Sequence, residues 1–330
     1  MSTDRITDPN KGIVFKKNTG IYTVHLSDRS LNCTLSPRLR AKTPPEGRGR
    51  QKVDHTFEHT DPVAVGDVVL VSETGGGSGQ ITAVEPRRNH LSRPTATPMP
   101  GAHAFEQIIA ANVDQVVPVF AAANPAPKWG MLDRYLVMAE AAGVPAVICI
   151  TKLDLAMDEN GRVEADLLQA AAEYRQAGYP VLLASANSRA GLDEVRETLA
   201  GRMSVLMGKS GVGKTSLLNA LQPGLGLRVN AVSQITGKGK HTTTHLEMFE
   251  LDFGGSILDT PGVREFGLWD ISEDELPGCF PEMRPYLGQC RFGLNCRHDE
   301  EPGCAVRKAV TAGQISPRRW QSYLHLRAEA

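Results

Sequence analysis

The residues with the clearest chemical pattern form a glycine-rich segment in the second half of the chain. Residues 208–215 fit the pattern G-x-x-x-x-G-K-[ST] at every fixed position. In this pattern backbone N–H groups converge on phosphate oxygens. An apolar strand, residues 203–207, precedes the segment and a helical stretch, residues 214–221, follows it. We expect Lys214 to reach the β- and γ-phosphates and Thr215 to bind Mg²⁺. The other expected nucleotide contacts are Gly208, Lys209, Ser210, Gly211, Val212, Gly213 and Ser216.

Two polar segments that follow predicted strands could contact the base of a nucleotide. Thr151-Lys152-Leu153-Asp154 resembles the guanine-reading motif of GTPases, although such proteins usually have Asn in place of Thr151. The carboxylate of Asp154 can accept hydrogen bonds from guanine N1–H and the exocyclic amine, a pattern that adenine does not offer. Lys152 can pack its stem over the base, and Ser185-Ala186 fits the second base-contacting loop. The alternative is a strand-to-helix turn with a capping Asp.

Two further segments fit the switches of GTPases. Asp259-Thr260-Pro261-Gly262 matches D-x-x-G, in which the Asp holds Mg²⁺ through water and the Gly amide senses the γ-phosphate. Within 241–244 (His-Thr-Thr-Thr), Thr243 would complete the Mg²⁺ shell, unless this run is only a β-edge segment. Val263 stands where many GTPases place a water-orienting Gln. We therefore expect slow intrinsic hydrolysis, with His241 as the candidate catalytic residue.

A cysteine and histidine cluster near the C-terminus is a candidate metal site. Cys290, Cys296, His298 and Cys304 follow the spacing C-x5-C-x-H-x5-C. Three thiolates and one imidazole suit a closed, structural Zn²⁺ site. The alternative is a pair of buried cysteines beside an unrelated surface His. The other cysteines of the chain have apolar surroundings or lie outside this spacing, and we expect them to be packing residues: Cys33, Cys149 and Cys279.

Composition and charge narrow the class of protein. The chain has 330 residues, 41% of them hydrophobic and 22% charged, which is ordinary for a soluble globular protein. It contains no apolar run long enough for a membrane span and no secretory signal, so we expect a cytoplasmic protein without membrane association. The net charge is +4 over residues 1–94, −9 over 95–283 and +4 over 284–330. Basic ends would attract a phosphate-rich partner, unless they are only solvated surface.

Changes in pattern along the chain predict a multidomain protein. Short strand-like segments dominate residues 12–85 and indicate a small β-barrel, so we expect a first domain at 1–94 with a disordered N-terminal tail. A Pro-rich linker over 93–101 leads into alternating strands and helices, which predict a parallel α/β domain at 95–268. Its helices are expected at 132–142, 164–177, 192–199 and 214–221. Residues 269–330 form the expected small α-rich, zinc-binding domain.

The base-reading motif precedes the phosphate loop, the reverse of the usual order, so the chain resembles a circularly permuted GTPase. With the barrel in front and the cysteine cluster behind, it is similar to the ribosome small-subunit-dependent GTPase A family. The resemblance rests on the motifs above and on these segments: Leu91-Ser92-Arg93-Pro94, Ala111-Asn112-Val113-Asp114, Lys240 to Thr244, Cys296-Arg297-His298 and Glu301-Pro302-Gly303-Cys304.

The resemblance implies an N-terminal OB-fold barrel, a permuted P-loop GTPase core and a zinc domain. It also implies that the protein binds the small ribosomal subunit and its rRNA, assists late maturation of the subunit, and hydrolyses GTP to GDP and phosphate with stimulation by it. We expect a monomer.

Two alternatives come from other classes. A P-loop kinase or ATPase would not prefer GTP over ATP. A binding module with a passive GTPase core would show no stimulation by small subunits.

Overall fold

The computed structural model describes residues 8–40, 61–94, 106–225, 246–259 and 271–329. The described residues form two compact units, each assembled from separate stretches of the chain. The first unit draws on Met1–Gln115, Thr198–Leu206 and Gly237–Gly267. The second draws on Val116–Glu197, Met207–Thr236 and Leu268–Ala330.

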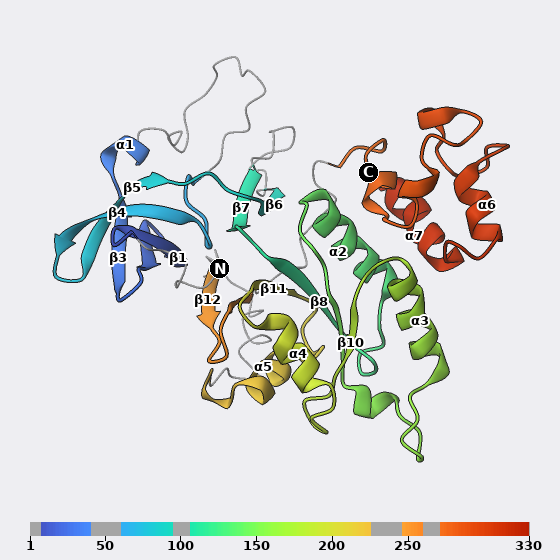
Figure 1. Cartoon of the computed structure of the whole chain (residues 1–330), viewed down its shortest axis with the longest axis horizontal. Helices are drawn as coiled ribbons and strands as arrows, with labels where there is room; N and C mark the ends of the chain where they lie inside the picture. Colours follow the sequence, from blue (N-terminus) through green and yellow to red (C-terminus); the bar gives the residue numbers. More distant parts are fainter. Residues whose placement is uncertain (1–7, 41–60, 95–105, 226–245, 260–270, 330) are drawn as a thin grey trace, which may run out of the picture. The chain divides into compact units, whose positions relative to one another are not determined.

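The first unit contains a closed barrel (Figure 1). The barrel strands are β1 (Lys11–Asn18), β2 (Ile21–His25), β3 (Ser30–Leu35), β4 (Val68–Gly75) and β5 (Ser78–Val84), with the short helix α1 (Pro37–Arg40) after β3. Pairing runs β1-β2-β3-β5-β4 and closes through β1 with β4; only β3 with β5 is parallel. This closed five-stranded barrel confirms the small β-barrel expected from the short strands and the OB-like architecture implied by the resemblance.

The barrel core follows the strand period of two. In β2 and β3 the buried residues alternate with exposed or half-buried ones, so one face of each strand points inward. The enclosed side chains are apolar or aromatic: Val14, Tyr22, Val24, Leu26, Leu31, Cys33, Val63, Val69, Val71 and Ile81. Cys33 is thus a packing residue, as its neighbours in the sequence indicated.

A second, two-stranded sheet corrects the expected linker. Strands β6 (His90–Pro94) and β7 (Glu106–Ala111) pair antiparallel, with Arg93 opposite Gln107. Arg93 and Pro94 are therefore strand residues, and β7 was not expected at all. The strand pattern was missed because Pro94 and the proline-rich residues after it read as a break; residues 95–105 lie outside the described part of the chain.

Parallel strands and helices alternate after β7, as expected for an α/β domain. In the second unit β8 (Gln115–Ala121), β9 (Ile148–Thr151) and β10 (Val181–Leu183) pair in parallel in the order β10-β9-β8. The residues of β8 and β9 are all buried, as parallel strands covered by helices should be. The accompanying helices are α2 (Trp129–Ala141), η2 (Leu153–Ala156), α3 (Ala165–Gln176), α4 (Leu192–Leu199), α5 (Lys214–Leu221) and η3 (Pro223–Leu225). Helix α2 begins three residues earlier than the expected 132.

Three more strands belong mainly to the first unit. Strand β11 (Met203–Met207) pairs in parallel with β13 (Ser256–Asp259), and β13 forms an antiparallel hairpin with β12 (Leu246–Glu250). The outer edge of β12 pairs with barrel strand β1, with Lys16 opposite Glu247. Through this pairing, strand β1 of the barrel continues the sheet that contains β11, β13 and β12.

The C-terminal residues of the second unit form short helices; within 271–329 no strand occurs. These helices are η5 (Leu276–Cys279), η6 (Arg284–Tyr286), η7 (Gly293–Asn295), α6 (Ala305–Thr311) and α7 (Pro317–Arg327). Their apolar core includes Cys279, as expected for a packing residue, and also Val137 from α2. Among the described residues, every helix is too short or too polar to cross a membrane.

A buried ionic network joins α7 to α2. Arg319 has no exposed side-chain surface and donates to Asp133 on α2 at 2.6 Å and to Glu282 at 2.7 and 3.1 Å. The Asp133 carboxylate also accepts from Tyr174 at 2.8 Å and from Ser322. Arg319 therefore pairs with two carboxylates and Asp133 accepts from three side chains, as buried charges require.

Candidate nucleotide-binding and metal sites

The phosphate loop lies between β11 and α5. A Cβ on Gly208 would lie 2.4 Å from the carbonyl oxygen of Val119, so only glycine fits there. Gly213 has φ +96°, a left-handed conformation that L side chains rarely adopt. These two glycines let the chain turn from β11 into α5, whose first N–H groups face the loop.

Lys214 lies under this loop. Its side chain is 6% exposed, and its Nζ donates to the carbonyl of Gly208 at 2.6 Å and to that of Lys209 at 3.3 Å. The ammonium group is therefore held beside the turn where phosphate oxygens bind in this motif. The remaining predicted phosphate contacts all lie on the loop or the first turn of α5: Ser210, Gly211, Val212, Thr215 and Ser216.

The predicted base-reading loop follows β9. Thr151 ends the strand, Lys152 takes the left-handed conformation with φ +56°, and Asp154 lies in η2. Lys152 Nζ donates to the carbonyl of Asn124, in the loop between β8 and α2. The backbone therefore turns sharply after β9 and directs the loop toward neighbouring loops at the same strand ends.

Thr151 brings the base-reading loop against the phosphate loop. Its Oγ1 donates to the carbonyl of Val212, 61 residues later in the chain, and lies 3.2 Å from the carbonyl of Phe120. A Cβ on Gly213 would lie 3.3 Å from Thr151 Oγ1. Two segments in reversed order along the sequence thus adjoin in the fold, as binding of one nucleotide requires.

Asp154 is oriented by the loop after β10. Ser185 Oγ donates to Asp154 Oδ1, and Asn187 Nδ2 lies 3.3 Å from Oδ2. The hydrogen bond from Ser185 is the main cause that lowers the pKa of Asp154 below 3.8. The carboxylate is ionised at neutral pH and can accept from guanine N1–H and the 2-amino group. Ala186 follows Ser185 in this loop and is half-buried.

The predicted switch residues are mostly not described. His241, Thr243 and Gly262 lie outside the described ranges, so their roles stay predictions. Asp259 is the last residue of β13, where its backbone pairs with Leu206 and Glu247.

The four predicted zinc ligands come together. Cys290, Cys296, His298 and Cys304 are buried, and their ligand atoms all lie within 4.8 Å of one another. Cys290 Sγ and Cys304 Sγ are each 3.5 Å from His298 Nδ1 and 3.9 Å from each other. A tetrahedral Zn²⁺ with ordinary bond lengths requires separations of about 3.5 Å for S to N and about 3.8 Å for S to S. The cluster could hold such an ion.

Backbone groups support the same sulfurs. Ala305 N–H donates to Cys290 Sγ at 3.2 Å, and Arg307 N–H donates to Cys304 Sγ at 3.4 Å. Trp320 Nε1 donates to the carbonyl of His298 at 2.9 Å, which holds the left-handed backbone of His298, φ +57°. N–H donors to sulfur are typical of thiolates that bind a metal, because they stabilise the negative charge.

Comparisons with known proteins agree with this arrangement. The family model "RsgA GTPase" matches residues 84–269. A protein of Gemmatimonas aurantiaca named "Small ribosomal subunit biogenesis GTPase RsgA" is 43% identical over 326 residues, 98% of each chain. The chain belongs to the RsgA GTPase family. It is therefore a GTP hydrolase.

Further RsgA relatives and solved structures extend the match. The RsgA protein of Pseudomonas aeruginosa is 42% identical over 274 residues, 83% of this chain and 78% of that one. The crystal structure of YjeQ from Thermotoga maritima superimposes with a TM-score of 0.71 at 31% identity, covering 97% of this chain and 98% of that one. YloQ, a circularly permuted GTPase, has a TM-score of 0.68 at 30% identity, covering 98% and 96%.

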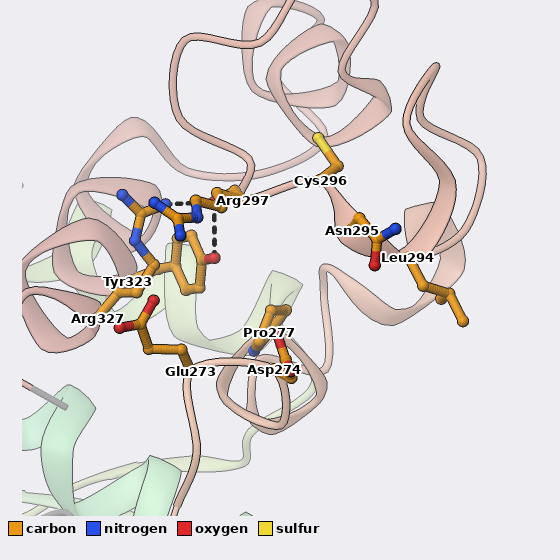
Figure 2. Close-up of a pocket in the computed structure, with 9 residues that line it drawn as sticks. All are labelled: Glu273, Asp274, Pro277, Leu294, Asn295, Cys296, Arg297, Tyr323 and Arg327. Carbon is orange, nitrogen blue, oxygen red and sulfur yellow. Dashed lines mark hydrogen bonds between the residues drawn. The ribbon is translucent and has the colours of Figure 1, made fainter.

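A pocket of about 250 Å³ lies beside the cysteine cluster of this RsgA-family chain (Figure 2). Tyr323 OH and Arg327 Nη1 both donate to the carbonyl of Arg297, which fixes one wall. The sulfur of Cys296 points away from the other lining side chains. The lining also includes Glu273, Asp274, Pro277, Leu294 and Asn295. Because carboxylates and guanidinium groups are both present, charge alone favours no ligand.

Two polar contacts of this chain were not predicted from the sequence. Asn187 contacts Asp154, and Arg319 joins α7 to α2. Asn187 follows the predicted Ser185-Ala186, so extending that motif by one residue would have included it. Arg319 lies in a basic run of the sequence that reads as surface, and only its buried partners show otherwise.

Proposed function

We propose that this chain binds GTP between the phosphate loop and the base-reading loop and hydrolyses it during biogenesis of the small ribosomal subunit. The observation that supports the proposal is the contact of Thr151 with Val212, because it joins the loop that carries Asp154 to the loop that fits the phosphate-binding pattern. The names of the relatives supply the biological role.

Each nucleotide-site residue has a chemical task in this proposal. Lys214 would neutralise charge on the β- and γ-phosphates, and Thr215 and Thr243 would bind Mg²⁺, which Asp259 would hold through water. Asp154, oriented by Ser185, reads the guanine edge, and Lys152 packs along the base. His241 orients the attacking water, because Val263 cannot. The Gly262 amide contacts the γ-phosphate.

The cysteine cluster takes a separate, structural part. Cys290, Cys296, His298 and Cys304 hold Zn²⁺, which supplies folding free energy to the C-terminal residues rather than chemistry. Four protein ligands would fill a tetrahedral site and would leave no open position for substrate. The net charge of +4 over residues 284–330 suits contact with rRNA. A role in biogenesis of the small ribosomal subunit would place the protein in the cytoplasm. We propose that it acts there as a monomer.

The test is GTP turnover by the full chain with and without purified small ribosomal subunits. We expect turnover with GTP and not with ATP, and stimulation by subunits. Lys214→Ala should abolish turnover, and His241→Ala should remove the stimulated part while GTP affinity is retained. Turnover that subunits leave unchanged would instead indicate a passive binding module, and equal use of ATP would contradict guanine recognition.

A further inference from the structure

The guanine-reading carboxylate has two side-chain donors, one on each oxygen. Ser185 Oγ donates to Asp154 Oδ1, and Asn187 Nδ2 lies 3.3 Å from Asp154 Oδ2. Ser185 is fully buried, whereas Asn187 is exposed. One donor alone would leave the carboxylate free to rotate about its χ2 angle, since terminal sp³–sp² torsions have broad minima. Two donors define the plane of the carboxylate.

The loop that carries Asn187 is held rigidly. Ser188 N–H donates to Ser185 Oγ at 3.1 Å, and Ser185 N–H donates to the carbonyl of Ala190 at 2.9 Å. A Cβ on Gly191 would lie 2.0 Å from the carbonyl of Leu183, so the loop returns tightly onto the end of β10. A side chain on such a loop can position another group, because its own backbone is already fixed.

Guanine recognition depends on this plane. Guanine offers two N–H donors side by side, N1–H and the 2-amino group, and a coplanar carboxylate accepts both. Inosine lacks the 2-amino group and can donate only N1–H. A carboxylate that rotates loses the paired arrangement first, so guanine loses more binding than inosine does.

Resting on the proposed GTP site, we propose that Asn187 is a specificity-determining positioning residue, which holds Asp154 Oδ2 in the guanine plane. It favours GTP over nucleotides that lack the 2-amino group. Its contact with Asp154 is partly exposed to solvent, so its contribution is smaller than that of Asp154 itself.

The test compares the affinities of GTP and ITP for the full chain with Mg²⁺ present. Asn187→Ala should weaken GTP binding about fivefold to tenfold and ITP binding about twofold or less, which lowers the GTP-to-ITP preference. Asn187→Asp should weaken GTP binding more, because it places a second carboxylate beside Asp154.

Asn160→Ala is the matched control, because Asn160 is an exposed asparagine and its backbone N–H, which the substitution keeps, donates to Asp158. It should leave both affinities unchanged. If Asn187→Ala weakens GTP and ITP binding equally, or weakens the binding of neither nucleotide, the inference is wrong while the proposed function stands. If the unaltered protein does not bind GTP at all, the proposed function fails first.

Discussion

The nucleotide loops and the cysteine–histidine cluster lie in the same compact unit of the chain but are held together in different ways. In the nucleotide loops, tight turns at Gly208 and Gly213 and a hydrogen bond from Thr151 hold two segments of the chain together without a metal. In the cluster, four potential metal ligands converge within 4.8 Å, and a bound ion would join all of them. GTP affinity should therefore fall in steps as single contacts are removed, whereas loss of one cluster ligand should abolish zinc binding.

The largest effect is expected from removing a cluster ligand with Cys296→Ser. Zinc binding in small domains contributes on the order of 10 kcal/mol, more than most domains have to spare. We expect loss of bound zinc and rapid proteolysis within 271–329, while GTP affinity changes about twofold at most. Zinc content, limited proteolysis and nucleotide titration check this. Cys279→Ser, outside the cluster, should retain zinc; loss of GTP binding in the ligand variant would show that the two sites are not independent.

The next largest effect should come from Arg319→Ala. This change leaves the buried carboxylates of Asp133 and Glu282 without their cation, at a cost of about 3–5 kcal/mol. We expect lower stability in chemical denaturation, with zinc still bound before unfolding. Arg307→Ala, at an exposed arginine of the same region, should change stability by less than about 0.5 kcal/mol. An equal effect of the two variants would mean that the network contributes nothing specific.

A smaller and purely nucleotide-directed effect is expected from Thr151→Val. The valine has a similar shape but no donor, so the buried carbonyl of Val212 loses its partner at about 1–3 kcal/mol. GTP affinity should fall about tenfold, measured by titration with a fluorescent analogue. Thr151→Ser keeps the hydroxyl and should bind nearly normally. Zinc content should be the same in both variants, which keeps the two sites distinct.

The smallest effect on GTP binding should come from acidification. Because the Ser185 hydrogen bond lowers the pKa of Asp154 below 3.8, the carboxylate stays ionised as pH falls from 8 to 5. A carboxyl group whose pKa is lowered in the folded protein is fully ionised above its ordinary pKa. It becomes protonated only as the pH falls through the lowered pKa. The ratio of GTP affinity to ITP affinity should therefore be level over this range, because both nucleotides carry the same triphosphate, whereas zinc binding, which needs thiolates, should weaken. A fall in that ratio between pH 8 and 5 would contradict the assignment of Asp154.

Much of both sites could be predicted because their signals are local. The phosphate loop has a fixed spacing between a strand and a helix, and β11 and α5 begin and end where the sequence predicted. The cluster ligands have a fixed spacing within 15 residues, from Cys290 to Cys304. The hairpin of β6 and β7 was missed, since its proline-rich neighbourhood hides the strand period.

The sequence alone predicts the barrel, most of the order of strands and helices, the phosphate loop and the four candidate zinc ligands, because periodicity and short spacings act within a few turns of chain. Only the tertiary structure decided that Thr151 meets Val212, that Asn187 supports Asp154, and that Arg319 is buried against Asp133. These contacts join residues from about 30 to nearly 190 positions apart, and no local propensity specifies them. These contacts form when strand ends and helices pack. Packing brings distant polar groups into one low-dielectric environment, where each group needs a hydrogen-bond partner.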